Sequence, residues 1–379
     1  MIFDYETLKV IWWLFVGVLL IGFALTDGFD LGVAALLPFT AKNDDERRVV
    51  INSIGPVWDG NQVWLITAGG ALFAAWPMVY AAAFSGFYFA LLLVLLALIL
   101  RPVGFDFRSK VPDPRWRSFW DWGLFVGGAV PALVFGVAFG NLFQGVPFHY
   151  DDTLRPFYTG SFWGLLNPFA LLVGVVSLSM LVLHGALYTQ LRTEAPISER
   201  ASRAALIAGG VFVISFALAG LWLAVGIDGY RVVSMPDHNS VLTPLVKTVA
   251  KGPSWFLHYG VHPILWVLPI AGVLGAAAAM RLSAWGRPGA GILASGVAIA
   301  ATILTAGVAM FPFVMPSSTN PGSSLTMWDS TSSHWTLQVM FWAVVVFLPL
   351  VLGYTTWAYH KLRGKITIDA VREQSKSIY

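Results

Sequence analysis

Three aspartates and one arginine lie within or beside the most apolar stretches of the sequence: Asp27, Asp30, Asp59 and Arg101. Charged side chains at membrane depth are costly unless they are paired or hydrated, and they commonly mark routes for protons or ions. Asp27 and Asp30 are three residues apart, so a helix that continues through them places both on one face. We therefore interpret the four residues as candidates for a proton or ion pathway.

Each of these residues also has a structural interpretation. Asp27 could be an exposed turn residue, and Arg101 could be an interfacial anchor whose charged end reaches the headgroups. Asp59 lies in the polar cluster 57–62 and could cap the segment that follows by accepting backbone N–H groups. For Asp30 and Asp59 we favour the functional interpretation.

The histidines do not form a pattern that ligates haem. Haem in a helical bundle usually takes His or Met ligands that point into the interior, and His184 is the one histidine that falls within an apolar span. Its position near the end of that span favours a polar residue at the headgroup boundary. Met310 and Met315 flank an aromatic and proline segment, where packing is the ordinary role. We expect no haem ligands in this chain.

Other chemistry is excluded by composition and by missing motifs. The sequence has no cysteine, which excludes disulfides, thiolate nucleophiles and iron–sulfur clusters. Neither a phosphate-binding glycine loop nor a Ser-His-Asp or HExxH arrangement is present. We therefore expect no catalytic residue and no metal site in this chain.

The composition is that of a membrane protein. Of the 379 residues, 57% are hydrophobic and only 11% are charged, and the mean hydropathy is +0.71. A soluble protein of this size needs far more charge to cover its surface, whereas a bundle that faces lipid needs charge only at its ends. The elements that position the candidate residues are therefore membrane-spanning helices.

Apolar runs long enough to cross a bilayer, about twenty residues each, occur eight times. The predicted spans are 8–28, 79–100, 123–142, 165–185, 205–226, 263–282, 290–311 and 336–357. A further apolar stretch, 63–75, is shorter and directly precedes the second span. Since two spanning helices cannot reverse direction within two residues, we predict an interfacial or re-entrant segment there.

With eight spans, both termini lie on the same side, and most of the 23 Lys and Arg residues lie on that side too. Positive charge concentrates in cytoplasmic loops. We therefore predict that both termini are cytoplasmic. On this topology Asp30 and Asp59 lie in the outer half of the membrane.

A weak internal repeat suggests how the spans are grouped. The first span leads into Asp27–Gly28–Phe29, and the fifth leads into Asp228–Gly229–Tyr230. Parallel repeats of this kind are common in polytopic membrane proteins. We predict an all-α polytopic membrane protein with a single membrane domain over 1–379, built as two pseudo-symmetric four-helix bundles, 1–200 and 201–379.

Several strings resemble subunit II of the cytochrome bd ubiquinol oxidases. They are TDGFD (26–30), WDGNQVW (58–64), GGALFAAWP (69–77), RPVGFD (101–106), GNLFQGV (140–146), Met310 to Ser318 and LTMWD (325–329). The resemblance extends from residue 1 to Tyr379 and is densest in the first 150 residues. Two departures are visible, the loop 234–258 and His184, where we expect a polar residue that does not ionise.

The resemblance implies a function that the residues alone do not give. In that family subunit I binds haem b and haem d, oxidises quinol and reduces oxygen to water, while subunit II binds no haem, supports assembly of the haem site and holds a structural quinone. It implies a multi-pass location in the bacterial cytoplasmic (inner) membrane and possible small single-helix accessory subunits. Asp30, Trp58, Asp59 and Arg101 match polar residues of the family's proton path from the cytoplasm.

Two alternatives stay open at this point. Repeated four-helix halves with carboxylates near the midplane would also suit a secondary transporter. Asp27, Asp30 and Asp59 could instead bind a cation, although such a site needs further oxygen ligands.

Overall fold

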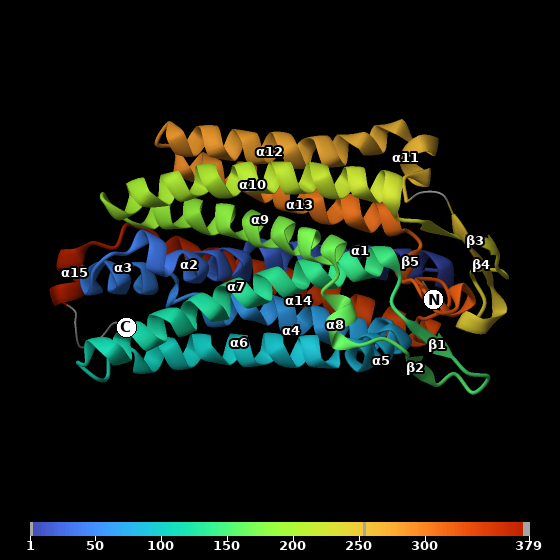
Figure 1. The fold of residues 1–379 in the computed structure, drawn as a ribbon. Helices are drawn as coiled ribbons and strands as arrows, with labels where there is room; N and C mark the ends of the chain where they lie inside the picture. Colours follow the sequence, from blue (N-terminus) through green and yellow to red (C-terminus); the bar gives the residue numbers. More distant parts are fainter. Residues whose placement is uncertain (1–2, 253–254, 374–379) are drawn as a thin grey trace.

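The computed structural model describes residues 3–252 and 255–373. Long helices lie side by side along one direction, and short β-hairpins cover one end of the bundle (Figure 1). We call that end the cap end. The opposite end, which contains α3 (Asp44–Ile54) and α15 (Ile368–Glu373), is called the cationic end for reasons given below.

The remaining elements are mostly helical. The other α-helices are α1 (Tyr5–Leu25), α2 (Asp27–Thr40), α4 (Trp58–Ala75), α5 (Pro77–Gly86), α6 (Tyr88–Phe107), α7 (Pro114–Gln144), α8 (Phe162–Leu165), α9 (Pro168–Arg192), α10 (Ile197–Gly226), α11 (Leu257–Val261), α12 (Val267–Ala284), α13 (Pro288–Met310) and α14 (His334–Lys361). The antiparallel pairs are β1 (Phe148–Tyr150) with β2 (Pro156–Tyr158), β3 (Gly229–Ser234) with β4 (Thr248–Gly252), and β5 (Phe313–Met315) with β6 (Leu325–Thr326). Short 3₁₀ turns occur at Pro244–Val246, Pro263–Trp266 and Pro321–Ser323.

The eight predicted spans are confirmed. Helical segments long and apolar enough to cross a membrane are Tyr5–Thr40, Tyr88–Phe107, Pro114–Gln144, Pro168–Arg192, Ile197–Gly226, Pro263–Ala284, Pro288–Met310 and His334–Lys361. The first is longer than predicted because α2 follows α1 after a break at Thr26.

The segment that we predicted as interfacial or re-entrant is a helix that runs the length of α1. At one end of α4, Asn61 contacts Asp30 of α2. At its other end, Ser332 donates its N–H to Ala75 and accepts a hydrogen bond at its carbonyl from Tyr5, the first residue of α1. An 18-residue helix spans about 27 Å. The re-entrant prediction was wrong because the helix begins inside the polar cluster, before the apolar run.

The two ends of the described chain lie at opposite ends of the bundle (Figure 1). Phe3 accepts a hydrogen bond from His334 at the start of α14, whereas α15 packs at the cationic end, where Arg372 pairs with Asp45 of α3. The prediction that both termini share one side was therefore wrong. The additional crossing by α4 changes the parity of the chain.

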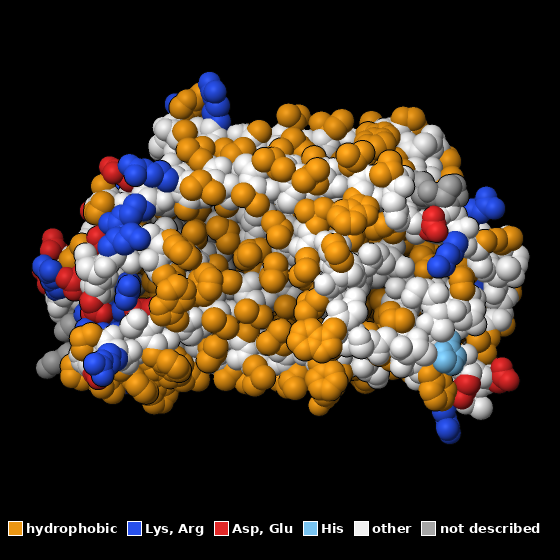
Figure 2. Space-filling view, in the orientation of Figure 1, with side chains coloured by type: hydrophobic (Ala, Val, Ile, Leu, Met, Phe, Trp, Pro, Cys, Tyr) orange, Lys and Arg blue, Asp and Glu red, His pale blue; other side chains and the backbone are white. Residues whose placement is uncertain are grey.

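Charge is distributed unequally between the two ends. Lys and Arg side chains gather on the end that contains α3 and α15 (Figure 2). Lys9 lies at the cap end, whereas Arg47 pairs with Asp121 at the cationic end. By the positive-inside rule we therefore expect the cationic end in the cytoplasm.

Helix α9 is the centre of the bundle and packs against α2, α7, α10 and α13. It can approach α2 closely because two glycines meet at the crossing. A Cβ on Gly32 would lie 2.1 Å from the carbonyl oxygen of Leu181, and one on Gly185 would lie 2.5 Å from the backbone of Gly32. Small residues at such crossings let helix backbones touch. The division into halves at residue 200 stays a prediction.

The cap end is held by two buried ammonium groups. Lys9 of α1 donates to the backbone carbonyls of His238 and Trp328, each at 2.8 Å. Lys247 forms an ion pair with Asp329 at 2.7 Å, with both side chains fully buried. Burial lowers the pKa of Lys247, and the neighbouring Asp329 charge partly opposes that effect. The loop that departs from the family is thereby attached to the bundle at His238 and Lys247.

Candidate functional site

Asp27 and Arg101 form an ion pair inside the bundle. The guanidinium nitrogens lie 2.6 and 3.1 Å from the two carboxylate oxygens, and both side chains are fully buried. Arg101 also lies over the indole of Trp58, 5.7 Å from the ring centroid. Neither structural alternative holds, since Asp27 is not an exposed turn residue and Arg101 does not reach the headgroups.

The break between α1 and α2 brings the carboxylates to the start of a helix. Thr26 separates the two helices, and both Asp27 and Asp30 fall in the first turn of α2. The free N–H groups of a first turn favour negative charge nearby. The three-residue spacing then places both carboxylates on the side of α2 that faces α4 and α6.

Asp30 is hydrogen-bonded to Asn61, and Asn61 is in turn hydrogen-bonded to Tyr359; the sequence neighbourhood of Asp30 reveals neither contact. Asn61 of α4 donates to Asp30 at 2.7 Å, and Tyr359 of α14 donates to the side-chain carbonyl of Asn61 at 2.6 Å. The second carboxylate oxygen, Oδ1, is buried and has no hydrogen-bond partner among the described residues. A buried oxygen without a partner is unusual and favours a proton or a water at that position.

Asp59 lies apart from this cluster. It is exposed on the surface of α4, and among the described residues it makes no hydrogen bond to Asp30. Trp58, its neighbour, is half-buried and contacts both Arg101 and Phe105. The structure thus brings together Asp30, Trp58 and Arg101 and leaves Asp59 on the outer face.

The predicted depth of the site was also wrong. Asp30 follows the complete length of α1 from the cap end, so the cluster lies towards the cationic end. There a cavity of about 270 Å³ is lined by Tyr188 and Tyr359 and bordered by Arg192 and Arg363. Tyr359 therefore lies between this cavity and the Asn61–Asp30 hydrogen bond.

His184 is buried rather than placed at the headgroup boundary. Its Nδ1 lies 2.7 Å from the hydroxyl of Ser295 on α13, and its Nε2 lies 3.1 Å from the carbonyl of Leu25 at the end of α1. Among the described residues no group of three or more His, Asp or Glu side chains is placed to hold a metal ion. The alternative cation site of Asp27, Asp30 and Asp59 is therefore not formed.

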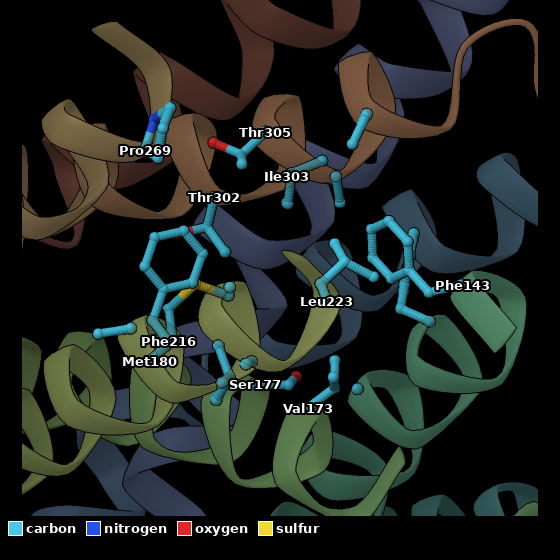
Figure 3. A pocket seen from close by; sticks show the side chains of 18 of the residues that line it. Phe143, Val173, Ser177, Met180, Phe216, Leu223, Pro269, Thr302, Ile303 and Thr305 are labelled. Atoms are coloured by element: carbon cyan, nitrogen blue, oxygen red, sulfur yellow. The ribbon is translucent and has the colours of Figure 1, made fainter. Parts of the chain in front are cut away.

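A second, larger cavity of about 980 Å³ lies among α1, α7, α9, α10, α12 and α13. Its wall is almost entirely apolar, and Figure 3 shows Met180, Phe216, Leu223 and Ile303 around it. The few hydroxyl groups include that of Thr302, which donates to its own helix. The cavity thus suits a long hydrocarbon chain.

Comparisons with known proteins agree with the resemblance. The chain is 55% identical over 377 residues to cytochrome bd-I ubiquinol oxidase subunit 2 of Escherichia coli, covering 99% of this chain and 100% of that protein. It is 54% identical, with the same coverage, to the probable cytochrome oxidase subunit 2 of Haemophilus influenzae, and 33% identical to cytochrome bd ubiquinol oxidase subunit 2 of Bacillus subtilis, covering 95% and 97%.

The fold is shared with a solved structure, the bd oxidase from Geobacillus thermodenitrificans. That likeness has a TM-score of 0.64 at 13% identity and covers 98% of this chain and 99% of that chain. The alternative of a secondary transporter is not supported by any of these relatives. Residues 8–362 match the family described as cytochrome bd terminal oxidase subunit II, and the chain therefore belongs to that family of oxidoreductase subunits in the bacterial cytoplasmic membrane.

Proposed function

We propose that this chain carries protons from the cationic end towards the oxygen-reducing site of the oxidase and binds no haem itself. Haem b and haem d then belong to the partner, subunit I, which oxidises ubiquinol and reduces oxygen to water. Oxygen reduction consumes protons, so the complex needs a route from the cytoplasm. The observation that carries the proposal is the buried Asp30, which has one hydrogen-bonded and one free oxygen.

The surroundings of Asp30 suit a proton-accepting carboxylate. Arg101 is neutralised by Asp27 through two hydrogen bonds, so no full positive charge is left to hold Asp30 ionised. Asn61 orients one oxygen of Asp30 and leaves the other free. An amide relays protons poorly, so we place water between the Tyr359 cavity and the free oxygen.

The partner is expected to cover one stripe of α4. Asp59, Val63, Ile66, Gly70 and Phe73 recur at intervals of four and three residues, which places them on one face, and all five are exposed in the chain alone. A carboxylate that faced lipid would be costly. We therefore assign this stripe to the interface with subunit I, where Asp59 would pass protons onward and Trp58 would line the route.

The assembly is tested by replacing Gly70 with leucine in the complete oxidase. A Cβ at Gly70 meets nothing within 4 Å in this chain, so the variant should fold but collide with the partner. We expect co-purified subunit I and its haem absorbance to fall at least about tenfold, because helix contacts through glycine tolerate little added volume.

The matched control is Gly210→Leu on α10, where a Cβ also meets nothing within 4 Å. It should retain partner and spectrum. Purification of this chain alone, without subunit I, should give a colourless protein. Stoichiometric haem in the isolated chain, or a normal complex with Gly70→Leu, would contradict the proposal.

The apolar cavity favours a second role, the binding of a structural quinone through its isoprenoid tail. Its volume of about 980 Å³ fits a long hydrocarbon chain, and its wall offers few polar groups for a reacting headgroup. Such a lipid would fill space between α9, α10 and α13 rather than turn over. Accessory single-helix subunits and bound lipids also remain part of the expected assembly.

The quinone role is tested with Gly220→Phe. Gly220 lines this cavity and a Cβ there would meet nothing within 4 Å, so we expect the added ring to occupy space in the cavity. We expect quinone extracted from the purified complex to fall to a small fraction of the wild-type ratio. Gly210→Phe on the same helix, outside the cavity lining, should leave that ratio unchanged. Equal quinone in both variants would refute the assignment.

A further inference from the structure

The break between α1 and α2 leaves a backbone carbonyl without its helical donor. In a continuous helix the N–H of Phe29 would bond to the carbonyl of Leu25, four residues earlier. Here that N–H donates instead to Thr26, at 3.3 Å. A carbonyl left unbonded inside a membrane protein is costly. The bend that carries Asp27 and Asp30 therefore needs a donor from elsewhere in the fold.

His184 of α9 lies where that donor is needed. Its Nε2 is 3.1 Å from the carbonyl oxygen of Leu25, and its side chain is almost completely buried, with 2% of the residue exposed. A carbonyl oxygen can only accept, so the Nε2 of His184 carries the hydrogen. This contact shows that Nε2 of His184 carries a hydrogen whether the imidazole ring is neutral or positively charged.

The ring of His184 is held from its other side by α13. Its Nδ1 lies 2.7 Å from the hydroxyl of Ser295, and that hydroxyl also lies 3.0 Å from the carbonyl of Ile292. With Nε2 as donor, the hydroxyl of Ser295 can donate to Nδ1. Ring and hydroxyl together link α13, α9 and the end of α1 through two hydrogen bonds.

Close packing leaves this linkage little freedom. Next to His184, Gly185 touches the backbone of α2 at Gly32, and a Cβ on Gly28 would lie 2.8 Å from Leu181 of α9. The helix that carries His184 is thus fixed against the helix that carries Asp30. Movement of the Leu25 carbonyl would move the first turn of α2, where Asp27 and Asp30 are located.

We infer that His184 is a positioning residue, which holds the α1–α2 break and thereby aims Asp27 at Arg101 and Asp30 at Asn61. The expected effect of His184 on turnover rests on the proposed proton route. Its expected effect on the geometry of Asp30 does not. A positioning role also accounts for His184, which departs from the pattern of the family.

The test uses the complete oxidase with His184→Leu and His184→Gln, and Ser179→Ala as the matched control. Ser179 is a buried polar residue of the same helix, and among the described residues its hydroxyl bonds only within α9. Glutamine can place an N–H near the Nε2 position, whereas leucine cannot. We expect His184→Leu to retain haem but to lose at least about tenfold in oxygen reduction, because small displacements of a catalytic group are expensive. His184→Gln and Ser179→Ala should stay within about threefold of wild type.

Infrared difference spectroscopy separates positioning from general damage. The carboxyl band that disappears in Asp30→Asn belongs to Asp30, and we expect it to shift in His184→Leu and to return in His184→Gln. If His184→Leu does not assemble, the same band is measured in Ser295→Ala, which weakens the link from the other side. An unshifted band in the assembled variant overturns the inference. If Asp30→Asn itself retains full turnover, the proton route is wrong, while a band shift would still support the positioning role.

Discussion

Asp30→Asn should assemble with full haem content and lose oxygen reduction by about a hundredfold, the size expected when a group that transfers protons is removed. The amide has nearly the same shape, and its oxygen can still accept the hydrogen bond from Asn61. It cannot release or take up a proton. The measurement is quinol-driven oxygen consumption per haem, together with the rate of proton uptake in a single turnover.

Two further variants define what the Asp30 result means. Asp59→Asn tests the onward step at the proposed interface and should also slow turnover while the haem spectrum is retained. Asp369→Asn at the cationic end removes an exposed carboxylate that contacts neither residue and should have no effect. Wild-type turnover in Asp30→Asn would show that the carboxylate is structural and that the route lies elsewhere.

Removal of Arg101 should have the largest effect on assembly. Arg101→Leu leaves Asp27 buried and unpaired, and loss of one partner from a buried pair costs about 3–5 kcal/mol. Asp27→Leu leaves the guanidinium unpaired and should be equally harmful. We expect the amount of assembled complex in membranes to fall more than about tenfold in either single variant. Its quantity is measured from the reduced-minus-oxidised spectrum.

The double variant Asp27→Leu/Arg101→Leu is the decisive comparison. The double variant leaves no unpaired charge in the interior. Replacement of both members of a buried ion pair by apolar residues is often tolerated for this reason. Assembly should therefore recover, while turnover stays low if Arg101 shapes the field at Asp30. A double variant that assembles no better than either single variant would show that the pair is not the cause of the loss.

Hydropathy predicted the eight spans well because each is strongly apolar and long enough to cross a bilayer. It failed at α4 for a specific reason. That helix begins with Trp58 and Asp59 inside a polar cluster, and Trp76 separates it from α5. A run of apolar residues alone was therefore too short to predict a crossing. One missed crossing reversed the predicted side of the N-terminus and the predicted depth of Asp30.

The sequence predicted which charged residues form the site, but it did not predict which of them contact each other. The cost of buried charge identified Asp27, Asp30 and Arg101 from the sequence, but spacing along the chain could not show that Arg101 pairs with Asp27. Asn61 was within the polar cluster and could have been named as a partner. Tyr359 carried no signal, because it lies 298 residues from the amide that it contacts.

That long separation has a consequence for the order in which the protein is made. The ribosome delivers Asp30 and Asn61 early, whereas Tyr359 belongs to the last long helix and enters the membrane only when translation is nearly complete. Until then the side-chain carbonyl of Asn61 lacks the hydrogen bond from Tyr359. The wall that α14 contributes to the cavity of about 270 Å³ is also missing. A prematurely terminated chain therefore lacks the hydrogen bond from Tyr359 and one wall of the cavity that belongs to the proposed proton route.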